Sequence, residues 1–393
     1  MDRTLELQRA MERFLEDLKP EMSAFSDHLG LNPELPGREY ESSRLFVEVL
    51  RKAGFEVEFP FLGIETAFMA RKKRGKGGVV ALLAEYDALP EIGHACGHNL
   101  HGTMSLYAGL ALGQAVEATG GEVWVVGTPA EEADGAKGPM SDAGVFDGVD
   151  LAMMIHSSGG KSWTDYRSLA LHGYDFTFRG KTAHAAAAPW EGRNALNGVK
   201  LFLLAMDMLR QHVRAETRMY GVITDGGTAV NVIPDRATCR VEARAPEKAG
   251  LDDLMEKLFD CARGAALATG TTVEWEKYLQ SFDDMLPNPE AETLIKEMLE
   301  AQGFACTAGP GAMGSTDVGN VSYRCPAIQP MVAITGRNLA LHTREFAEAT
   351  FTEEAHDALL RATKALAATG LRVLADPSLR DRIRSVFPIR DRH

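Results

Sequence analysis

The sequence lacks several features that would place it in a class directly. No apolar run approaches the ~20 residues that a membrane-spanning helix needs, so a membrane protein is not expected. Cysteine is scarce, with five residues and no framework spacing, which excludes a disulfide scaffold. Positive charge is in deficit, since 42 Lys and Arg stand against 55 Asp and Glu. With a formal net charge of −13 and no basic stripe, nucleic acid is not an expected partner.

What the chain does have is the composition of a globular protein, with 45% hydrophobic and 25% charged residues. Its 393 residues are too many for one ordinary core, so we expect two domains. Residues 1–22 are charged throughout and spaced like an amphipathic helix, which is unlike a signal peptide. Together with the scattered cysteines, this pattern predicts a cytoplasmic location, where Cys96 would stay reduced.

The first part of the chain alternates helices with buried strands. A helix is predicted over Ser42–Ala53, with strands near Val79–Leu83, Glu122–Gly127 and Leu151–His156. This alternation is typical of a doubly wound, mainly parallel α/β sheet. We therefore predict an α/β catalytic domain made of residues 1–165 and, where the alternation resumes, residues 284–393.

Between these parts the pattern changes at about Tyr166. Strands and two long helices follow in the order β-α-β-β-α-β, which is the ferredoxin-like plan. Residues 166–283 are therefore predicted to form a discrete inserted domain.

Polar side chains follow several of the buried strands. The segment "HACGHN" offers Cys96 and His98 on one side of an extended loop, and thiolate with imidazole suits zinc and the later first-row metals. Other strands end at Glu131–Glu132, at His156 and shortly before His342. Taken singly, each has a plainer interpretation, such as a capping histidine or a solvated acidic loop. Because strands of one sheet bring their ends together, the four groups point to a shared site.

The adjacent carboxylates of Glu131 and Glu132 would repel each other without a cation nearby. A metal ion gives them different tasks, because one can bind the ion while the other stays free as a general base.

In their order, these motifs resemble the amidohydrolase branch of the aminoacylase/carboxypeptidase family of dinuclear metallohydrolases. The family's motifs occur here over nearly the whole chain as "EYDALPEIGHACGHNL", "PAEEADGAKG", "GKTAHAAAAP", "NVIP", "GSTDVGNVSY" and "LHTREF". Within the branch, "AEYDAL", "CGHNL" and "STDVGNVS" are most similar to the group of p-aminobenzoyl-glutamate hydrolase B subunits and Xaa-Arg dipeptidase-like proteins.

The resemblance implies a zinc-peptidase-like catalytic domain with an inserted lid and dimerisation domain. It implies two divalent metal ions per chain (Zn, Mn, Co or Ni), with the ligands Cys96, His98, Glu132, His156 and His342. Glu131 would be the general base, Asp87 would orient a ligand and His184 would stabilise the oxyanion. The residues implied in substrate binding are Asn231, Gly314, Ser315 and Thr316.

Plainer roles stay open for some of these residues. Asn231 could equally be a turn-capping amide, and the segment that begins at Gly314 could be a tight turn. His94 and His101 could either contact and orient the metal ligands or cap the nearby helix, and both roles are left open.

The predicted function is metal-dependent hydrolysis of the amide bond in N-acyl amino acids, aminobenzoyl-glutamate-like conjugates or dipeptides with a free carboxylate. A homodimer or a dimer of dimers is expected. Two alternatives remain: a catalytically silent metal-binding homologue, and a hydrolase of a different amide or amidine class. Glu131 weighs against the silent homologue, because a pure binding site needs no base. The sequence determines neither the substrate's side chain and acyl group nor the native metal. The last third is shorter than in the family's B subunits, so a different pocket is expected.

Overall fold

The computed structural model describes residues 3–387, which form two compact units. Unit 1 comprises the described residues of Met1–Arg167, Met285–Gly311 and Asp317–His393. Unit 2 comprises Ser168–Asp284 together with the short segment Ala312–Thr316. Within the described residues, no helix is long and apolar enough to cross a membrane.

Unit 1 is built on a six-stranded sheet with the strand order β1-β2-β4-β3-β5-β11. Strands β3, β4, β5 and β11 run parallel, while β1 and β2 pair antiparallel at one edge. This arrangement confirms the mainly parallel α/β sheet predicted from the sequence. The strands are β1 (Glu56–Glu58), β2 (Phe68–Arg74), β3 (Val79–Ala84), β4 (Gly121–Gly127), β5 (Leu151–Met153) and β11 (Ala327–Ile328).

One predicted strand is wrong in its extent. The sequence predicts a single strand over Leu151–His156, but the structure has β5 followed by a separate strand β6 (His156–Gly159). Strand β5 pairs with β3 and β11, whereas β6 pairs in parallel with β12 (Met331–Thr335) in a two-stranded sheet. Residues 154–155, where the chain changes partners, are buried and apolar, so the hydrophobic run continues across the break.

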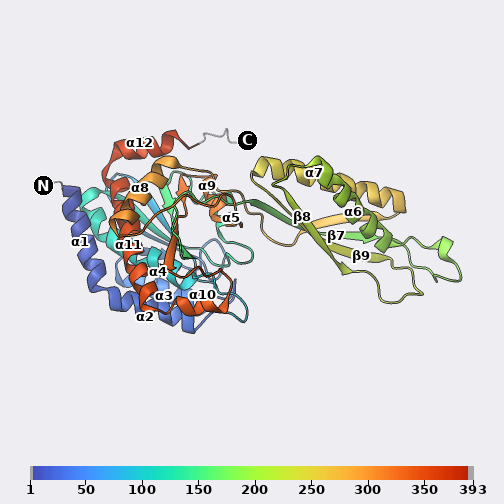
Figure 1. The fold of residues 1–393 in the computed structure, drawn as a ribbon, viewed down its shortest axis with the longest axis horizontal. Coiled ribbons are helices and arrows are strands. Elements are labelled where there is room, and N and C mark those ends of the chain that lie inside the picture. Colours follow the sequence, from blue (N-terminus) through green and yellow to red (C-terminus); the bar gives the residue numbers. More distant parts are fainter. Residues whose placement is uncertain (1–2, 388–393) are drawn as a thin grey trace. The chain divides into compact units, whose positions relative to one another are not determined.

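Helices cover both faces of the main sheet (Figure 1). Along β3, Val80 and Leu82 pack into one core cluster and Ala81 and Leu83 into another, as the alternation of side chains along a strand requires. The second cluster includes residues of α5 (Lys137–Asp142) and α9 (Val318–Ser322). The first includes residues of α1 (Arg3–Asp17), α2 (Lys19–Leu31), α3 (Tyr40–Lys52), α4 (His98–Thr119), α8 (Pro289–Ala301), α10 (Arg344–Ala349), α11 (Glu353–Ala375) and α12 (Pro377–Ser385).

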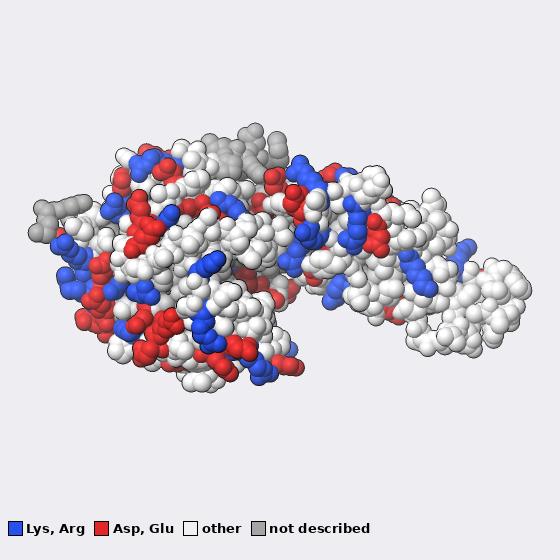
Figure 2. All heavy atoms as spheres, in the orientation of Figure 1, with Lys and Arg blue, Asp and Glu red and all other residues white. Residues whose placement is uncertain are grey.

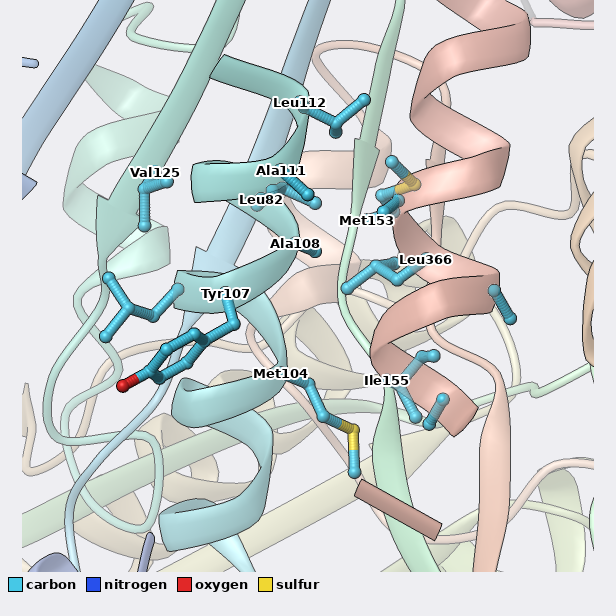
Figure 3. Packing of buried hydrophobic residues seen from close by; sticks show 14 of the residues in the cluster. Leu82, Met104, Tyr107, Ala108, Ala111, Leu112, Val125, Met153, Ile155 and Leu366 are labelled. Carbon is cyan, nitrogen blue, oxygen red and sulfur yellow. The ribbon is translucent and has the colours of Figure 1, made fainter. Parts of the chain in front are cut away.

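Helix α4 is apolar nearly all round, which is the pattern of a helix buried on every side. In Figure 3 Val125 of β4 lies on one side of α4 and Leu366 of α11 on the other. Burial of each such side chain stabilises the fold by about 1.5–3 kcal/mol. This packing holds the N-terminus of α4, which begins at His98, next to the ends of the parallel strands.

Unit 2 is an antiparallel four-stranded sheet with the order β10-β7-β9-β8 and two long helices. Its elements follow in the order β-α-β-β-α-β, so the predicted ferredoxin-like plan is confirmed. Helices α6 and α7 pack with the sheet around one apolar cluster. The elements are β7 (Ala170–Arg179), η1 (Pro189–Glu191), α6 (Ala195–Leu209), η2 (Arg210–His212), β8 (Arg218–Asp225), β9 (Arg236–Ala245), α7 (Lys248–Thr269) and β10 (Thr272–Lys277).

The close approach of α4 to the end of β3 depends on a glycine. A Cβ at Gly102 would lie 2.3 Å from the carbonyl oxygen of Glu85. We expect Gly102→Ala to lower the free energy of unfolding by about 1–3 kcal/mol, because backbone cannot move aside as a side chain can. The control is Gly264→Ala in α7, where a Cβ would meet nothing within 4 Å; this change should stabilise by up to about 1 kcal/mol. Thermal and denaturant unfolding measure both, and equal effects of the two variants would contradict the close approach.

Candidate metal centre

The candidate side chains of unit 1 lie where the parallel strands end. Ala84 of β3 pairs with Gly127 of β4, so the residues after both strands leave the sheet at the same edge. Glu85 and Asp87 follow β3, and the Glu131–Glu132 pair follows β4. The carboxyl ends of parallel strands are where α/β folds place their ligands.

The structure brings all five predicted ligands together. Metal-binding atoms lie within 4.8 Å of one another in three overlapping groups. These groups are Cys96, His98 and His156; Cys96, Glu132 and His342; and His98, Glu131 and Glu132.

Several pairs of candidate donor atoms lie close together. Cys96 Sγ lies 3.3 Å from His156 Nε2, and His342 Nε2 lies 3.3 Å from Glu132 Oε1. His98 Nε2 is 4.0 Å from Glu132 Oε1. The five groups therefore converge on one small volume.

Two atoms of this cluster show that its residues suit a metal ion. Within the described residues, His98 Nε2 and Glu132 Oε1 are buried and make no hydrogen bond. Buried polar atoms without partners are rare and costly, so their convergence here calls for a positive ligand. Thiolate sulfur, imidazole nitrogen and carboxylate oxygen are the donors that zinc and later first-row ions accept. The donor set therefore fits one or more divalent metal ions.

The Asp87 carboxylate forms hydrogen bonds with both residues that carry these atoms, His98 and Glu132. Its Oδ1 accepts a hydrogen bond from His98 Nδ1 at 3.0 Å, and its Oδ2 accepts one from the Glu132 N–H at 2.9 Å. Because His98 donates through Nδ1, Nε2 is the nitrogen that a metal ion can bind, in exchange for a proton where the ring is charged. Burial alone would lower the pKa of His98, but the Asp87 charge outweighs it and raises that pKa well above its ordinary value.

Left-handed backbone occurs in two of the segments that carry predicted ligands. Ala130, just before the glutamates, has φ 63°, and His342 has φ 61°. This conformation costs a non-glycine residue about 1–2 kcal/mol and persists only where its surroundings impose it. At His342, the backbone N–H donates to the Ala95 carbonyl at 2.8 Å, which ties this predicted ligand to the Cys96 segment.

The two adjacent glutamates lie in different surroundings. Burial, followed by the charges of Glu85 and Glu132, raises the pKa of Glu131 well above its usual range. Burial would also raise the pKa of Glu132, but its contact with His342 lowers that pKa to about 2. Glu132 is therefore the carboxylate better suited to binding a cation, and Glu131 the one better suited to carrying a proton.

A buried lysine that sequence reasoning missed lies beside this pair. Lys137 Nζ donates to Glu85 Oε1 and to Asp317 Oδ1, both at 2.6 Å, and all three side chains are buried. Carboxylate oxygens of Glu85, Glu131 and Asp317 lie within 4.8 Å of one another. The Lys137 cation thus offsets part of the concentrated negative charge. A lysine among small residues in "DGAKG" was the available signal.

The two histidines whose roles the sequence left open have different surroundings. His101 Nε2 accepts a hydrogen bond from the Ser157 N–H at 2.7 Å, and His101 Nδ1 lies 3.4 Å from Glu85 Oε2. His101 therefore spans two strand ends. His94 is buried, and within the described residues neither of its ring nitrogens makes a side-chain hydrogen bond. Burial lowers the pKa of His94 to about 3, so it is neutral.

In unit 2, the predicted oxyanion histidine and substrate-binding asparagine are neighbours. The Ala185 N–H donates to the Asn231 carbonyl at 2.9 Å. His184 Nδ1 accepts from the backbone N–H groups of Ala186 and Ala187 at 3.3 and 3.2 Å. An Nδ1 that accepts leaves the proton on Nε2, so exposed His184 presents an N–H donor.

The predicted carboxylate-binding segment, Gly314–Thr316, also belongs to unit 2. The Leu169 N–H donates to the Gly314 carbonyl at 2.9 Å, and Ser315 Oγ donates to the Leu169 carbonyl at 2.8 Å. Arg244 Nη1 donates to Ser315 Oγ at 3.2 Å. Sequence reasoning missed this arginine, whose signal was a charged residue inside the alternating strand at 236–245.

Comparison with known proteins agrees with this geometry. The peptidase dimerisation domain of the M20 family matches residues 169–269. Xaa-Arg dipeptidase of Mus musculus is 36% identical, over 96% of this chain and 91% of that protein. The B subunit of p-aminobenzoyl-glutamate hydrolase from Escherichia coli (strain K12) is 29% identical, over 95% of this chain and 93% of its own length.

A solved structure gives the same fold. The YXEP protein of Bacillus subtilis, described as a dinuclear metal binding peptidase from the M20 family, matches with a TM-score of 0.64 and 21% identity. The match covers 93% of this chain and 99% of that one. By its sequence relatives and its fold, this chain belongs to the M20 family of metallopeptidases and amidohydrolases, in the group of Xaa-Arg dipeptidase and the p-aminobenzoyl-glutamate hydrolase B subunits, as its motifs predict.

Proposed function

We propose that this protein hydrolyses the amide bond of a dipeptide, an aminobenzoyl-glutamate-like conjugate or another N-acyl amino acid whose carboxylate is free. The observation that carries the proposal is the convergence of His98 Nε2 and Glu132 Oε1, which make no hydrogen bond in the described part of the chain, beside a second carboxylate, Glu131. A pure metal-binding site would need the first two groups but not a protonatable neighbour.

In this proposal two divalent ions are held by Cys96, His98, Glu132, His156 and His342. Such ions polarise a carbonyl oxygen and make water a stronger acid. The set accepts Zn, Mn, Co or Ni, and the thiolate favours the softer of these ions.

The chain's own residues supply the remaining chemistry. Glu131 takes a proton from the attacking water and delivers it to the leaving amine nitrogen. His184 donates a hydrogen bond from its Nε2–H to the developing oxyanion. Asn231 and the Gly314–Thr316 segment, with the adjacent Arg244 guanidinium, hold the free carboxylate.

We further propose a homodimer, or a dimer of dimers, assembled through unit 2. Strand β8 ends the sheet of unit 2, so one of its edges is open to a further strand. Large apolar side chains lie exposed on this strand and on α6, including Leu204, Met208, Val222 and Ile223. On the face shown in Figure 2 one end of unit 2 is largely uncharged. The sequence "GGTAVNVIP", which lies between β8 and β9, also has no charged residue. An apolar surface with an open strand edge supports self-association.

A cytoplasmic location is part of the proposal. All five cysteines are free, and several are buried where oxidation would disturb the core. Proteins of reducing compartments use cysteine in this way.

The direct test of the proposed function is turnover of free-carboxylate amides by metal-loaded protein. We expect hydrolysis of at least one member of a panel of Xaa-Arg dipeptides, p-aminobenzoyl-glutamate and N-acetyl amino acids after loading with Zn, Mn, Co or Ni. The carboxamide analogue of the best substrate should be at least ~100-fold poorer in kcat/KM, because the groups that hold the carboxylate lose a charged partner. Undiminished activity in protein freed of metal would contradict the proposal, as would equal turnover of the carboxamide.

Matched substitutions separate the two glutamates. Glu131→Gln keeps the shape of the side chain and removes the base, so kcat should fall by ~10²–10⁴ while metal content stays near that of wild type. Glu132→Gln removes a ligand charge, so metal content should fall together with activity. Metal analysis and steady-state kinetics on both variants measure these effects, and exchanged phenotypes would show that the roles are reversed.

Complementation tests whether His184 acts in the neighbouring subunit. Glu131→Gln and His184→Ala homodimers should both be nearly inactive. In a mixed dimer, the His184→Ala chain keeps its own Glu131 and receives an intact His184 from its partner, so about half of wild-type activity per dimer should return. Two affinity tags isolate the mixed dimer for assay. If it stays inactive, His184 acts within its own chain or not at all.

A further inference from the structure

The turn that carries Glu131 and Glu132 is held in a conformation its own residues do not favour. Ala130 lies in the left-handed region at φ 63°, and no glycine relieves the strain there. The Ala130 carbonyl accepts from the Gly135 N–H at 2.8 Å, which closes the far side of the turn. A group outside the turn must hold the backbone at Ala130, because Glu131 would point in another direction if Ala130 adopted a favoured conformation.

That external group is the carboxylate of Glu39, at the N-terminus of α3. Glu39 Oε1 accepts the Ala130 N–H at 2.8 Å, although the two residues are 91 apart in sequence. The same oxygen accepts the Gly37 N–H at 2.9 Å, and Oε2 accepts the Thr66 hydroxyl at 2.9 Å. The Glu39 side chain is fully buried, and in the described part of the chain no ion pair reaches it.

The turn is thus anchored at two points by two buried carboxylates. Glu39 holds the N–H of Ala130, and Asp87 holds the N–H of Glu132 at 2.9 Å. Glu131 lies between these anchors, so its direction is set by both. Asp87 also touches the ligand His98, whereas the contacts of Glu39 are with the turn, Gly37 and Thr66.

We propose that Glu39 is a positioning residue for catalysis, which clamps the strained Ala130 and thereby aims Glu131 at its substrate. The proposal rests on the proposed function, in which Glu131 is the general base. The ligand Glu132 is anchored separately through Asp87, so loss of Glu39 should leave metal binding intact. Misplacement of a base by about 1 Å can cost up to ~100-fold in rate, which sets the expected size of the effect.

The test compares variants that keep or remove the acceptor. Glu39→Ala should lower kcat by ~10–100-fold with little change in KM or metal content. Glu39→Gln should stay within ~3-fold of wild type, because its amide oxygen can accept both backbone N–H groups while its NH₂ donates to Thr66 Oγ1. An equal loss of kcat in both variants would overturn the positioning role of Glu39. Loss of metal from Glu39→Ala would overturn it too.

Glu34 supplies the matched structural control. It caps the same helix end through Oε1 and Oε2, which accept the N–H groups of Glu41 and Ser42 at 3.1 and 2.7 Å. These hydrogen bonds lie within the helix end and not on the Ala130 turn, so Glu34→Ala should keep kcat within ~3-fold while losing some stability. A kcat loss equal to that of Glu39→Ala would mean that any damage to this helix end suffices.

A double-mutant cycle separates positioning from general structural damage. In the Glu131→Gln background, Glu39→Ala should change the residual kcat by less than ~2-fold, since its effect runs through the missing base. A further 10-fold loss there would overturn the proposal. If Glu39→Ala does not fold, Glu39→Asp, which keeps the charge but shortens the reach, takes its place in the cycle.

The outcomes also distinguish this inference from the proposed function. Full kcat in Glu131→Gln would refute the general base and with it the clamp, whereas the absence of turnover by metal-loaded wild type would refute the proposed function itself. Loss of kcat in Glu131→Gln with full kcat in Glu39→Ala would refute only the clamp.

Discussion

Repulsion between buried carboxylates is the constraint on which the rest of this site depends. Glu85, Asp87, Glu131 and Asp317 are all buried within one edge of the sheet. Burial of so many like charges is unfavourable unless cations or donors offset each of them. Lys137 offsets Glu85 and Asp317, and His98 together with a backbone N–H offsets Asp87. What remains is Glu131 and, beside it, Glu132 Oε1 and His98 Nε2, which make no hydrogen bond within residues 3–387; a divalent ion would complete this arrangement.

The fold makes this concentration of charge possible because it supplies rigidity from apolar packing. Helix α4 is clamped between the sheet and α11, so the Cys96–His98 segment at its N-terminus cannot retreat from the strand ends. Ala130 and His342 then hold left-handed backbone that free peptides avoid. Leu62 and Glu91 are left-handed as well, but the strain at Ala130 and His342 lies in segments that bear predicted ligands or the proposed base. It is maintained by hydrogen bonds from outside those segments, at Glu39 and Ala95.

Much of this could be predicted from the sequence, and the failures have a common cause. Strands β3 and β4 were predictable because each is a short apolar run that ends in polar residues. The split between β5 and β6 was not, since the hydrophobic run is unbroken where the hydrogen-bond partners change. Glu39 and Lys137 were missed because their partners lie 91, 52 and 180 residues away. Local sequence patterns do not indicate such long-range pairings. In the sequence alone, a buried lysine or glutamate cannot be told from a solvent-exposed one.

The most direct measurement of the central claim is anomalous X-ray scattering from crystals of the metal-loaded protein. The account predicts two anomalous peaks in the cluster, bounded by Cys96, His98, Glu132, His156 and His342, at the ligand distances of about 2.0–2.3 Å expected for zinc. His98 Nε2 and Glu132 Oε1 should each lie at ligand distance from a peak. Peaks located instead between Glu85 and His101, or no peak in protein that is fully active, would contradict it.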